Sequence, residues 1–331
     1  MKPKAIALLS GGLDSTLAVR LILDQGVEVE ALSFVTPFCT CNRKGRCESR
    51  HVADQLGIPL RITILTEEFF QVLKNPRYGY GSGTNPCLDC RILMFSRARE
   101  RMEEVGADFV FTGEVLGQRA MSQHRRAMRI IDRESGLEGR LLRPLSAKLL
   151  VPTIPEREGI VDREKLLAIE GRSRKEQMAL AAERGITDYP CPAGGCRLTD
   201  PGFARRMRDL VEHKTDFDLN DVNLLKVGRH FRLSSRAKAV VGRNEEEKRY
   251  MLMLTQQGDL LFEVRTCGSP LTLLRGRRGR DRIRLAGAIT ARYSDARGAE
   301  VWVHYGADYA ALNESVLVSP LGQQELTRLR I

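Results

Sequence analysis

The stretch AIALLSGGLDST, residues 5–16, decides the fold of the first half of the chain. Its five leading apolar residues predict a short buried strand, and Gly11 and Gly12 mark a tight turn into a helix. Because glycine has no Cβ, a ligand can come close to the backbone of such a turn. The unpaired amides at the helix start and the nearby hydroxyls form a cradle for an anion. The residues that we expect to hold a phosphate are Ser10, Gly11, Gly12, Leu13, Ser15 and Thr16.

Strands and helices alternate after this loop. Apolar runs at 27–34, 60–64 and 108–112 predict three more strands, and apolar residues at helical spacing predict helices between them. Such alternation is typical of α/β proteins, in which helices cover both faces of a parallel sheet. Ligands bind there at the carboxyl ends of the strands, where the glycine-rich loop lies. No lysine follows the glycines, so the loop is not of the GxxxxGK[ST] type.

The character of the sequence changes in the second half. Helical spacing continues to about residue 212, and the polar stretch at 213–226 predicts a linker. From residue 227, short apolar runs predict strands of a smaller α+β domain. We therefore expect a domain over 1–212 and a second domain over 227–331.

The composition of the 331 residues excludes several classes of protein. The chain is 42% hydrophobic but has no apolar stretch of membrane-spanning length, so we expect a cytoplasmic protein without a membrane partner. A formal net charge of +11 favours a polyanionic partner. Eight cysteines in an intracellular chain favour metal binding or catalysis over a disulfide framework.

Cys87 and Cys90 stand three residues apart at the start of a long predicted helix, 86–104. Asn85 as N-cap and Pro86 as first helical residue would place both sulfurs on one face of the first turn. The positive end of the helix dipole and the neighbouring Arg91 are expected to favour thiolates. The pair therefore predicts metal or sulfur chemistry.

A third thiol can come from the loop between Cys191 and Cys196. Together with Cys87 and Cys90 it would supply three ligands of a [4Fe-4S] cluster whose fourth iron stays open. The same thiols also suit a zinc site, or a dithiol that carries sulfur as a persulfide. The sequence leaves these alternatives open.

Cys39, Cys41 and Cys47, followed by His51, form another group. Their spacing is only loosely that of zinc ligands, because ligands separated by one residue crowd a tetrahedral site. We expect these thiols near the nucleotide base, with a metal as the alternative. Cys267 stands apart and is expected to pack in the second domain.

Four ordered motifs resemble those of a known family: Ser10–Ser15, Asn85–Cys90, Thr112–Gln118 and Leu142–Leu145. The chain resembles the PP-loop ATP pyrophosphatases, and among them the catalytic domain of tRNA 4-thiouridine synthases and the tRNA 2-thiouridylases. The resemblance implies an ATP-dependent tRNA sulfurtransferase. Such an enzyme adenylates a uridine carbonyl with release of pyrophosphate, and sulfur then displaces AMP to give 4-thiouridine or 2-thiouridine.

The resemblance also implies roles for individual residues. Asp14 would orient Mg²⁺ or the triphosphate of ATP, and Arg143 or Lys148 would neutralise the alpha phosphate. The adenosine would contact the backbone of Phe34 and Gly113 or Glu114. The cysteines that match the cluster-binding plan of the family are Cys87, Cys90 and Cys196, with Cys191 in reserve.

The C-terminal domain resembles the NFACT-R domain, a module linked with RNA. The resemblance rests on residues 231–234, 241–245 and 268–275. Guanidinium groups crowd the positions that follow, and this density suits phosphate contacts, although a solvated basic strand edge is the alternative. The expected RNA-binding residues are Arg275, Arg277, Arg278, Arg280, Arg282 and Arg284.

Two other functions fit parts of the sequence. A PP-loop enzyme that amidates or ligates with a nitrogen nucleophile would use the loop and leave the cysteines without a task. An RNA-binding quality-control module without turnover would use mainly the C-terminal domain. The sequence also leaves open which uridine is modified, whether sulfide or a cysteine desulfurase with a persulfide carrier donates sulfur, and whether the chain forms a homodimer.

Overall fold

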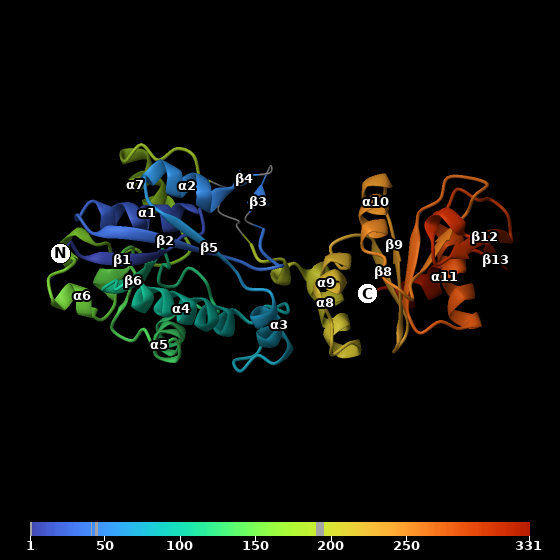
Figure 1. The fold of residues 1–331 in the computed structure, drawn as a ribbon, viewed down its shortest axis with the longest axis horizontal. Coiled ribbons are helices and arrows are strands. Elements are labelled where there is room, and N and C mark those ends of the chain that lie inside the picture. Colours follow the sequence, from blue (N-terminus) through green and yellow to red (C-terminus); the bar gives the residue numbers. More distant parts are fainter. Residues whose placement is uncertain (1, 41, 44–45, 190–194) are drawn as a thin grey trace. The chain divides into compact units, whose positions relative to one another are not determined.

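The computed structural model describes residues 2–40, 42–43, 46–189 and 195–331. The chain divides into two compact units, and the boundary lies between Asp200 and Pro201 (Figure 1). Within the described residues, no helix combines the length and the apolar character needed to cross a bilayer.

The first unit is built on a five-stranded parallel sheet. Its strands follow the order β5-β2-β1-β6-β7, and each neighbouring pair is parallel. The predicted parallel α/β fold is therefore confirmed. The strands are β1 (Lys4–Leu8), β2 (Glu28–Val35), β5 (Leu60–Ile64), β6 (Phe109–Thr112) and β7 (Leu141–Leu142).

Helices cover both faces of this sheet, because its buried strands are apolar on both sides. Ala5 and Ala7 of β1 pack with α1 (Leu13–Leu23), α2 (Glu48–Leu56) and α7 (Lys175–Glu183), whereas Ile6 packs with α4 (Cys87–Glu104) and α5 (Arg125–Glu134). Figure 1 shows these two groups of helices on opposite sides of the strands. The remaining elements of the unit are β3 (Asn42–Arg43), β4 (Arg46–Cys47), α3 (Glu67–Lys74) and α6 (Ile154–Arg157).

The second unit is built on a six-stranded antiparallel sheet of order β13-β12-β10-β11-β9-β8. Helix α11 (Arg280–Tyr293) packs on one face, and α9 (Leu219–Leu224) and α10 (Glu245–Met253) pack on the other. The predicted smaller α+β domain is thus confirmed. The other elements are α8 (Pro201–His213), α12 (Gln323–Leu329), β8 (Arg229–Ser234), β9 (Ala237–Val241), β10 (Leu260–Glu263), β11 (Thr272–Gly276), β12 (Val301–Gly306) and β13 (Glu314–Val318).

The boundary in the structure lies earlier than the sequence indicated, at 200/201 rather than near 212. Helix α8 belongs to the second unit because Asp209 accepts a hydrogen bond from Arg232 Nε of β8 (2.9 Å). The expected linker at 213–226 contains α9, whose Val222 and Leu224 are buried in the core of that unit. Its polar appearance reflects a short amphipathic helix, which presents only one face to the core.

Candidate functional site

The glycine-rich loop joins β1 to α1 at the carboxyl end of the central strand. Gly11 has a left-handed backbone (φ +75°), and a Cβ there would lie 2.5 Å from the backbone of Glu48, so only glycine fits. Ser15 Oγ and Thr16 Oγ1 donate hydrogen bonds to the carbonyl oxygen of Gly12, at 2.8 and 3.0 Å. These bonds hold the start of α1 open toward a ligand.

The loop opens into a cavity of about 340 Å³. Residues from the ends of β1, β2 and β6 line it, and so do four thiols. Gly11 and Thr16 shape the loop without belonging to the lining. Of the residues expected to bind nucleotide or sulfur, the cavity brings together Ser10, Gly12, Leu13, Asp14, Ser15, Phe34, Cys87, Cys90, Gly113, Glu114 and Cys196.

Gly113, directly after β6, lets the backbone approach the first turn of α1 closely. A Cβ at this position would lie 2.5 Å from the carbonyl oxygen of Asp14 and from the amide nitrogen of Ser15. The residue after β6 therefore touches the first turn of α1 directly, and a side chain there would displace this turn.

Asp14 is the most unusual carboxylate of the cavity. Burial raises its pKa, against the opposing effects of Arg174 and of a hydrogen bond from Gln118. Its Oδ2 lies 3.2 Å from Arg174 Nη2 and 3.1 Å from Gln118 Nε2. Its Oδ1 is buried and has no hydrogen-bond partner among the described residues. A buried carboxylate oxygen without a partner suits a hard cation such as Mg²⁺.

Three cationic side chains lie in the cavity wall: Arg91, Arg119 and Arg174. Arg91 was expected beside the thiols, whereas Arg119 and Arg174 were not predicted from the sequence. Burial and the charges of Arg91 and Arg174 lower the pKa of Arg119, which shows that the three charges lie close together. Arg91 pairs with Glu114 (Nε to Oε1, 3.4 Å) and Arg174 with Asp14, so within the described residues Arg119 is the guanidinium of the three without an ion pair and the one best placed to contact an anionic ligand. Arg119 directly follows the Thr112–Gln118 motif and could have been found there, whereas nothing in the sequence links Arg174 to the loop.

The role expected for Arg143 needs correction. Its side chain is buried, with Nε 3.1 Å from Glu114 Oε2 and Nη1 3.0 Å from Asp132 Oδ2, and it does not line the cavity. These two carboxylates neutralise the charge of Arg143. Arg143 therefore positions Glu114 and does not contact a phosphate. Lys148 likewise lies outside the lining and pairs with Glu164 (Nζ to Oε2, 3.1 Å).

The pair Cys87 and Cys90 lies in the first turn of α4, as expected, but the helix begins one residue later than predicted. Pro86 is the N-cap residue, and Asn85 makes no cap. The Nδ2 group of Asn85 instead donates to Cys87 Sγ (3.0 Å). The expected thiolate is wrong for Cys90, because burial raises the pKa of its thiol to about 12 and outweighs the effect of Arg91.

Cys196 reaches the cavity from a distant segment. Arg197 N–H donates to the carbonyl of Phe38 (3.0 Å), and Thr84 N–H donates to that of Leu198 (3.2 Å), so the segment is held between two loops of the sheet edge. Burial raises the pKa of the Cys196 thiol to about 12. Cys191 and Cys41 lie outside the described residues.

The structure separates Cys39 from Cys47 and His51, which were expected to lie together. Cys39 lines the cavity near Phe34, whereas Cys47 and His51 do not. Cys47 Sγ lies 3.4 Å from Ser49 Oγ, and His51 Nε2 lies 2.8 Å from Asp188 Oδ2. Cys267 packs against the hydrophobic core of the second unit, as expected.

The thiol set was tested as a metal site. In the described parts of the chain, no three His, Cys, Asp or Glu side chains converge on one metal ion. Each thiolate of a [4Fe-4S] cluster binds a different iron, so its ligands need not meet at one point. The donor set Cys87, Cys90 and Cys196 therefore fits a cluster in its chemistry, because three thiols from two segments share one cavity.

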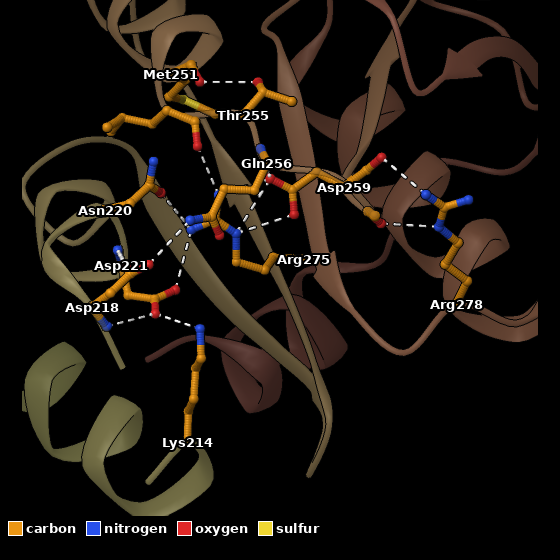
Figure 2. Close-up of polar contacts among 12 residues, drawn as sticks. Lys214, Asp218, Asn220, Asp221, Met251, Thr255, Gln256, Asp259, Arg275 and Arg278 are labelled. Atoms are coloured by element: carbon orange, nitrogen blue, oxygen red, sulfur yellow. Dashed lines mark hydrogen bonds and ion pairs between the residues drawn. The ribbon is translucent and has the colours of Figure 1, made fainter. Parts of the chain in front are cut away.

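The arginines of the second unit have unequal surroundings. Arg275 is committed to protein contacts, with Nε 3.1 Å from Asp259 Oδ1 and Nη1 3.2 Å from Asp221 Oδ1 (Figure 2). The expectation that Arg275 meets RNA is therefore corrected. Arg278 donates to the carbonyl of Gly258 (2.9 Å) and Arg282 to Ser234 Oγ (3.1 Å).

Arg280 and Arg284 differ, since neither forms an ion pair within the described residues. Both line a second cavity of about 450 Å³ between α11 and strands β12 and β13, together with Tyr305. Arg277 is exposed in the turn before α11. These three guanidinium groups remain available to an anion.

A parallel sheet with a glycine-rich loop at the carboxyl end of its central strand defines the class of the first unit, an α/β domain whose architecture resembles that of PP-loop proteins. Residues 1–148 match the family described as thiamine biosynthesis protein (ThiI). Residues 228–330 match the family described as NFACT protein RNA binding domain. Both resemblances inferred from the motifs are thereby confirmed.

Curated relatives agree with the first match. The chain is 37% identical over 117 residues to the tRNA-specific 2-thiouridylase MnmA of Syntrophotalea carbinolica, which covers 33% of each chain. It is 30% identical over 209 residues to the protein of the same name from Mycobacterium leprae, which covers 58% of this chain and 54% of the relative. The chain thus spans about a third to about half the length of these relatives.

Among solved structures, a 4-thiouridine synthetase–RNA complex with bound ATP is 25% identical. The likeness covers 68% of this chain and 52% of that one, with a TM-score of 0.37.

Proposed function

We propose that the protein is an ATP-dependent tRNA sulfurtransferase that converts a uridine into 4-thiouridine or 2-thiouridine. The observation that carries the proposal is the shared cavity, because the phosphate loop and three thiols face the same space. Activation of a carbonyl by ATP and attack by sulfur require this proximity, since the activated intermediate must meet the sulfur before water does.

In the proposed first step, the loop holds the triphosphate. The amides at the start of α1 donate to phosphate oxygens, and Arg91, Arg119 and Arg174 neutralise the charge that develops at the alpha phosphorus. The uridine carbonyl oxygen attacks this phosphorus, and pyrophosphate leaves. The uridine must be turned out of its stack to enter the cavity.

In the proposed second step, a sulfur nucleophile adds to the uridine carbon, and AMP leaves with the former carbonyl oxygen. Cys87, Cys90 and Cys196 would hold a [4Fe-4S] cluster, which would supply an open iron for a sulfur ligand when bound. Asp14 Oδ1 would hold Mg²⁺, which would screen the charge of the triphosphate when bound. The aspartate itself stays oriented by Gln118 and Arg174.

The second unit would supply the RNA contact. Arg277, Arg280 and Arg284 are the candidates, because Arg275 is consumed by internal ion pairs. The match of residues 228–330 to an RNA-binding family supports this assignment. The wall of its cavity combines two guanidinium groups with Tyr305, a combination that suits phosphate and base together.

The proposal is tested by replacing Cys87, Cys90 and Cys196 with alanine one at a time. Each variant is expected to release RNA-dependent pyrophosphate but to form no thiouridine, because the proposed first step uses the loop and the three arginines but none of the thiols. Cys267→Ala is the matched control and should form thiouridine as the wild type does. Pyrophosphate release without thiouridine in the wild type would favour a nitrogen-nucleophile enzyme, and no release at all would favour an RNA-binding module.

A further inference from the structure

Cys39 and Cys196 face each other across a short backbone bridge that the proposed reaction does not use. Cys39 lies in the loop after β2, and Cys196 lies 157 positions later, yet the two residues form an isolated antiparallel pair. Gly195 N–H donates to Thr40 Oγ1 (3.1 Å), and Arg197 N–H donates to the carbonyl of Phe38 (3.0 Å). Residues on both sides of the two cysteines are therefore joined.

The hydrogen-bond pattern fixes the type of pair. The backbone bond runs between the neighbours of the cysteines, from Arg197 to Phe38, so Cys39 and Cys196 are a non-hydrogen-bonded pair. Such pairs have Cα atoms about 4.5 Å apart, with their side chains close together. A disulfide bridges Cα atoms separated by about 4.4–6.8 Å, so the backbone already has a suitable spacing.

Both sulfurs lie on the same side of the bridge, because both cysteines line the nucleotide cavity. The backbone N–H of Thr36 donates to Cys39 Sγ (3.3 Å) and holds this sulfur at the cavity wall. Cys47, eight positions after Cys39, lies outside the cavity. Of the two described thiols of this group, Cys39 is thus the one placed to react with Cys196.

We propose that Cys39 and Cys196 form a reversible disulfide that withdraws Cys196 from the chemistry of the cavity. With a small-molecule disulfide as oxidant, one cysteine thiolate attacks a sulfur of the reagent and releases one thiol. The second cysteine then attacks the mixed disulfide and expels the other thiol. Two electrons pass from the cysteine pair to the reagent, and a dithiol reverses both steps.

The link itself is tested without ATP or RNA. The full chain, with Cys41→Ser and Cys191→Ser, is treated with oxidised glutathione, alkylated, and digested with trypsin without reductant. In this background, the peptides 21–43 and 185–197 contain Cys39 and Cys196 as their single cysteines. We expect a linked mass of these two peptides, which dithiothreitol removes.

Two variants in the same background sharpen the result. Cys39→Ser should abolish the linked mass, and Cys267→Ser should leave it unchanged. A link from Cys196 to the peptide 78–91, which contains Cys87 and Cys90, would overturn the proposal. The absence of any link at Cys196 would overturn it as well.

The withdrawal of Cys196 rests on the proposed thiolation and is measured separately. Oxidised wild-type protein should lose thiouridine formation and regain it with dithiothreitol. In Cys39→Ser, oxidised and reduced protein should form thiouridine to nearly the same extent. If the linked peptide forms and thiouridine formation persists, the withdrawal is wrong and the disulfide stands. A linked peptide in a chain that never forms thiouridine would overturn the proposed function alone.

Discussion

Single residues decide whether the cavity can exist. Gly11 and Gly113 allow approaches of backbone to backbone that no other residue permits, and Asp14 is kept in place by two side chains from different segments. The motif around Gly11 was readable from the sequence, because its chemistry is local. The contact of Gly113 with Asp14 was not, since it depends on how two strands pair.

Replacing Gly113 with alanine tests this contact. The new Cβ would lie 2.5 Å from the backbone of Asp14, so the loop must shift, and we expect a loss of ATP binding and of about 1–3 kcal/mol in stability. Titration calorimetry and thermal unfolding measure the two effects. Gly322→Ala is the control, because it meets no atom within 4 Å and has φ −66°. Normal ATP affinity in Gly113→Ala would contradict the geometry.

Lys238 gives a pH-dependent prediction. Burial on β9 lowers the pKa of its amine to about 7 from an ordinary value of 10.5, although Asp209 acts in the opposite direction. Between these two pH values the unfolded chain binds a proton that the folded chain does not. The free energy of unfolding should therefore rise with pH in this window, by up to about 1.4 kcal/mol per pH unit from this group.

Lys238→Met should remove this slope and raise stability at pH 7, because a methionine has no charge to desolvate. Asp209 keeps its hydrogen bond from Arg232 Nε (2.9 Å). Urea unfolding at several pH values, followed by the fluorescence of Trp302, measures it. This is the single tryptophan of the chain, and it lies in the second unit. Parallel pH profiles of the two proteins would refute the assignment.

At the scale of elements, the structure shows why charge density alone misassigned some residues. Arg143 and Arg275 were expected to contact phosphate, and each is instead held by two carboxylates, of which all but that of Asp132 are buried. The prediction of a thiolate at Cys90 was wrong for a similar reason, because burial raises the pKa of this thiol more than the charge of Arg91 lowers it. The position of these three residues along their elements could be predicted from the sequence. Their burial could not, because it depends on which other elements pack against them.

Arg275 connects three elements of the second unit. Figure 2 shows its guanidinium group between Asp221 of α9 and Asp259 before β10. Both carboxylates are only 3% exposed, so Arg275→Met would leave them buried without this partner. We expect a loss of about 3–5 kcal/mol, measured by urea unfolding at the Trp302 signal. Arg277→Ala, at an exposed site, should change stability by no more than about 0.5 kcal/mol.

At the scale of the whole molecule, two kinds of unit share one chain: an α/β unit with a cavity at the glycine-rich loop and an α+β unit with available arginines. The order of motifs was enough to predict an α/β unit followed by an α+β unit, and eleven of the residues expected to bind nucleotide or sulfur line the cavity. Arg174 comes from a distant segment, and only the folded chain reveals its place at the cavity. Cys39 was expected there, but its separation from Cys47 and His51 was not.

The proposed RNA contact of the second unit predicts how RNA binding depends on the salt concentration. Arg280→Ala and Arg284→Ala should each weaken RNA binding and reduce the slope of log K against log salt by about 1, because each removes one phosphate contact. Arg249→Ala, an exposed residue of α10 on the opposite face of the sheet, serves as control. Filter binding at several salt concentrations measures the slopes, and unchanged slopes in both α11 variants would move the RNA contact elsewhere.

The central claim is that ATP activation and sulfur transfer occur in one cavity. It is tested most directly by incubating tRNA with ATP, Mg²⁺, sulfide and protein purified without oxygen, followed by mass spectrometry of the nucleosides and quantification of AMP and pyrophosphate. We expect one thiouridine for each AMP and each pyrophosphate released. AMP and pyrophosphate without thiouridine, or thiouridine that forms equally well without ATP, would contradict the claim.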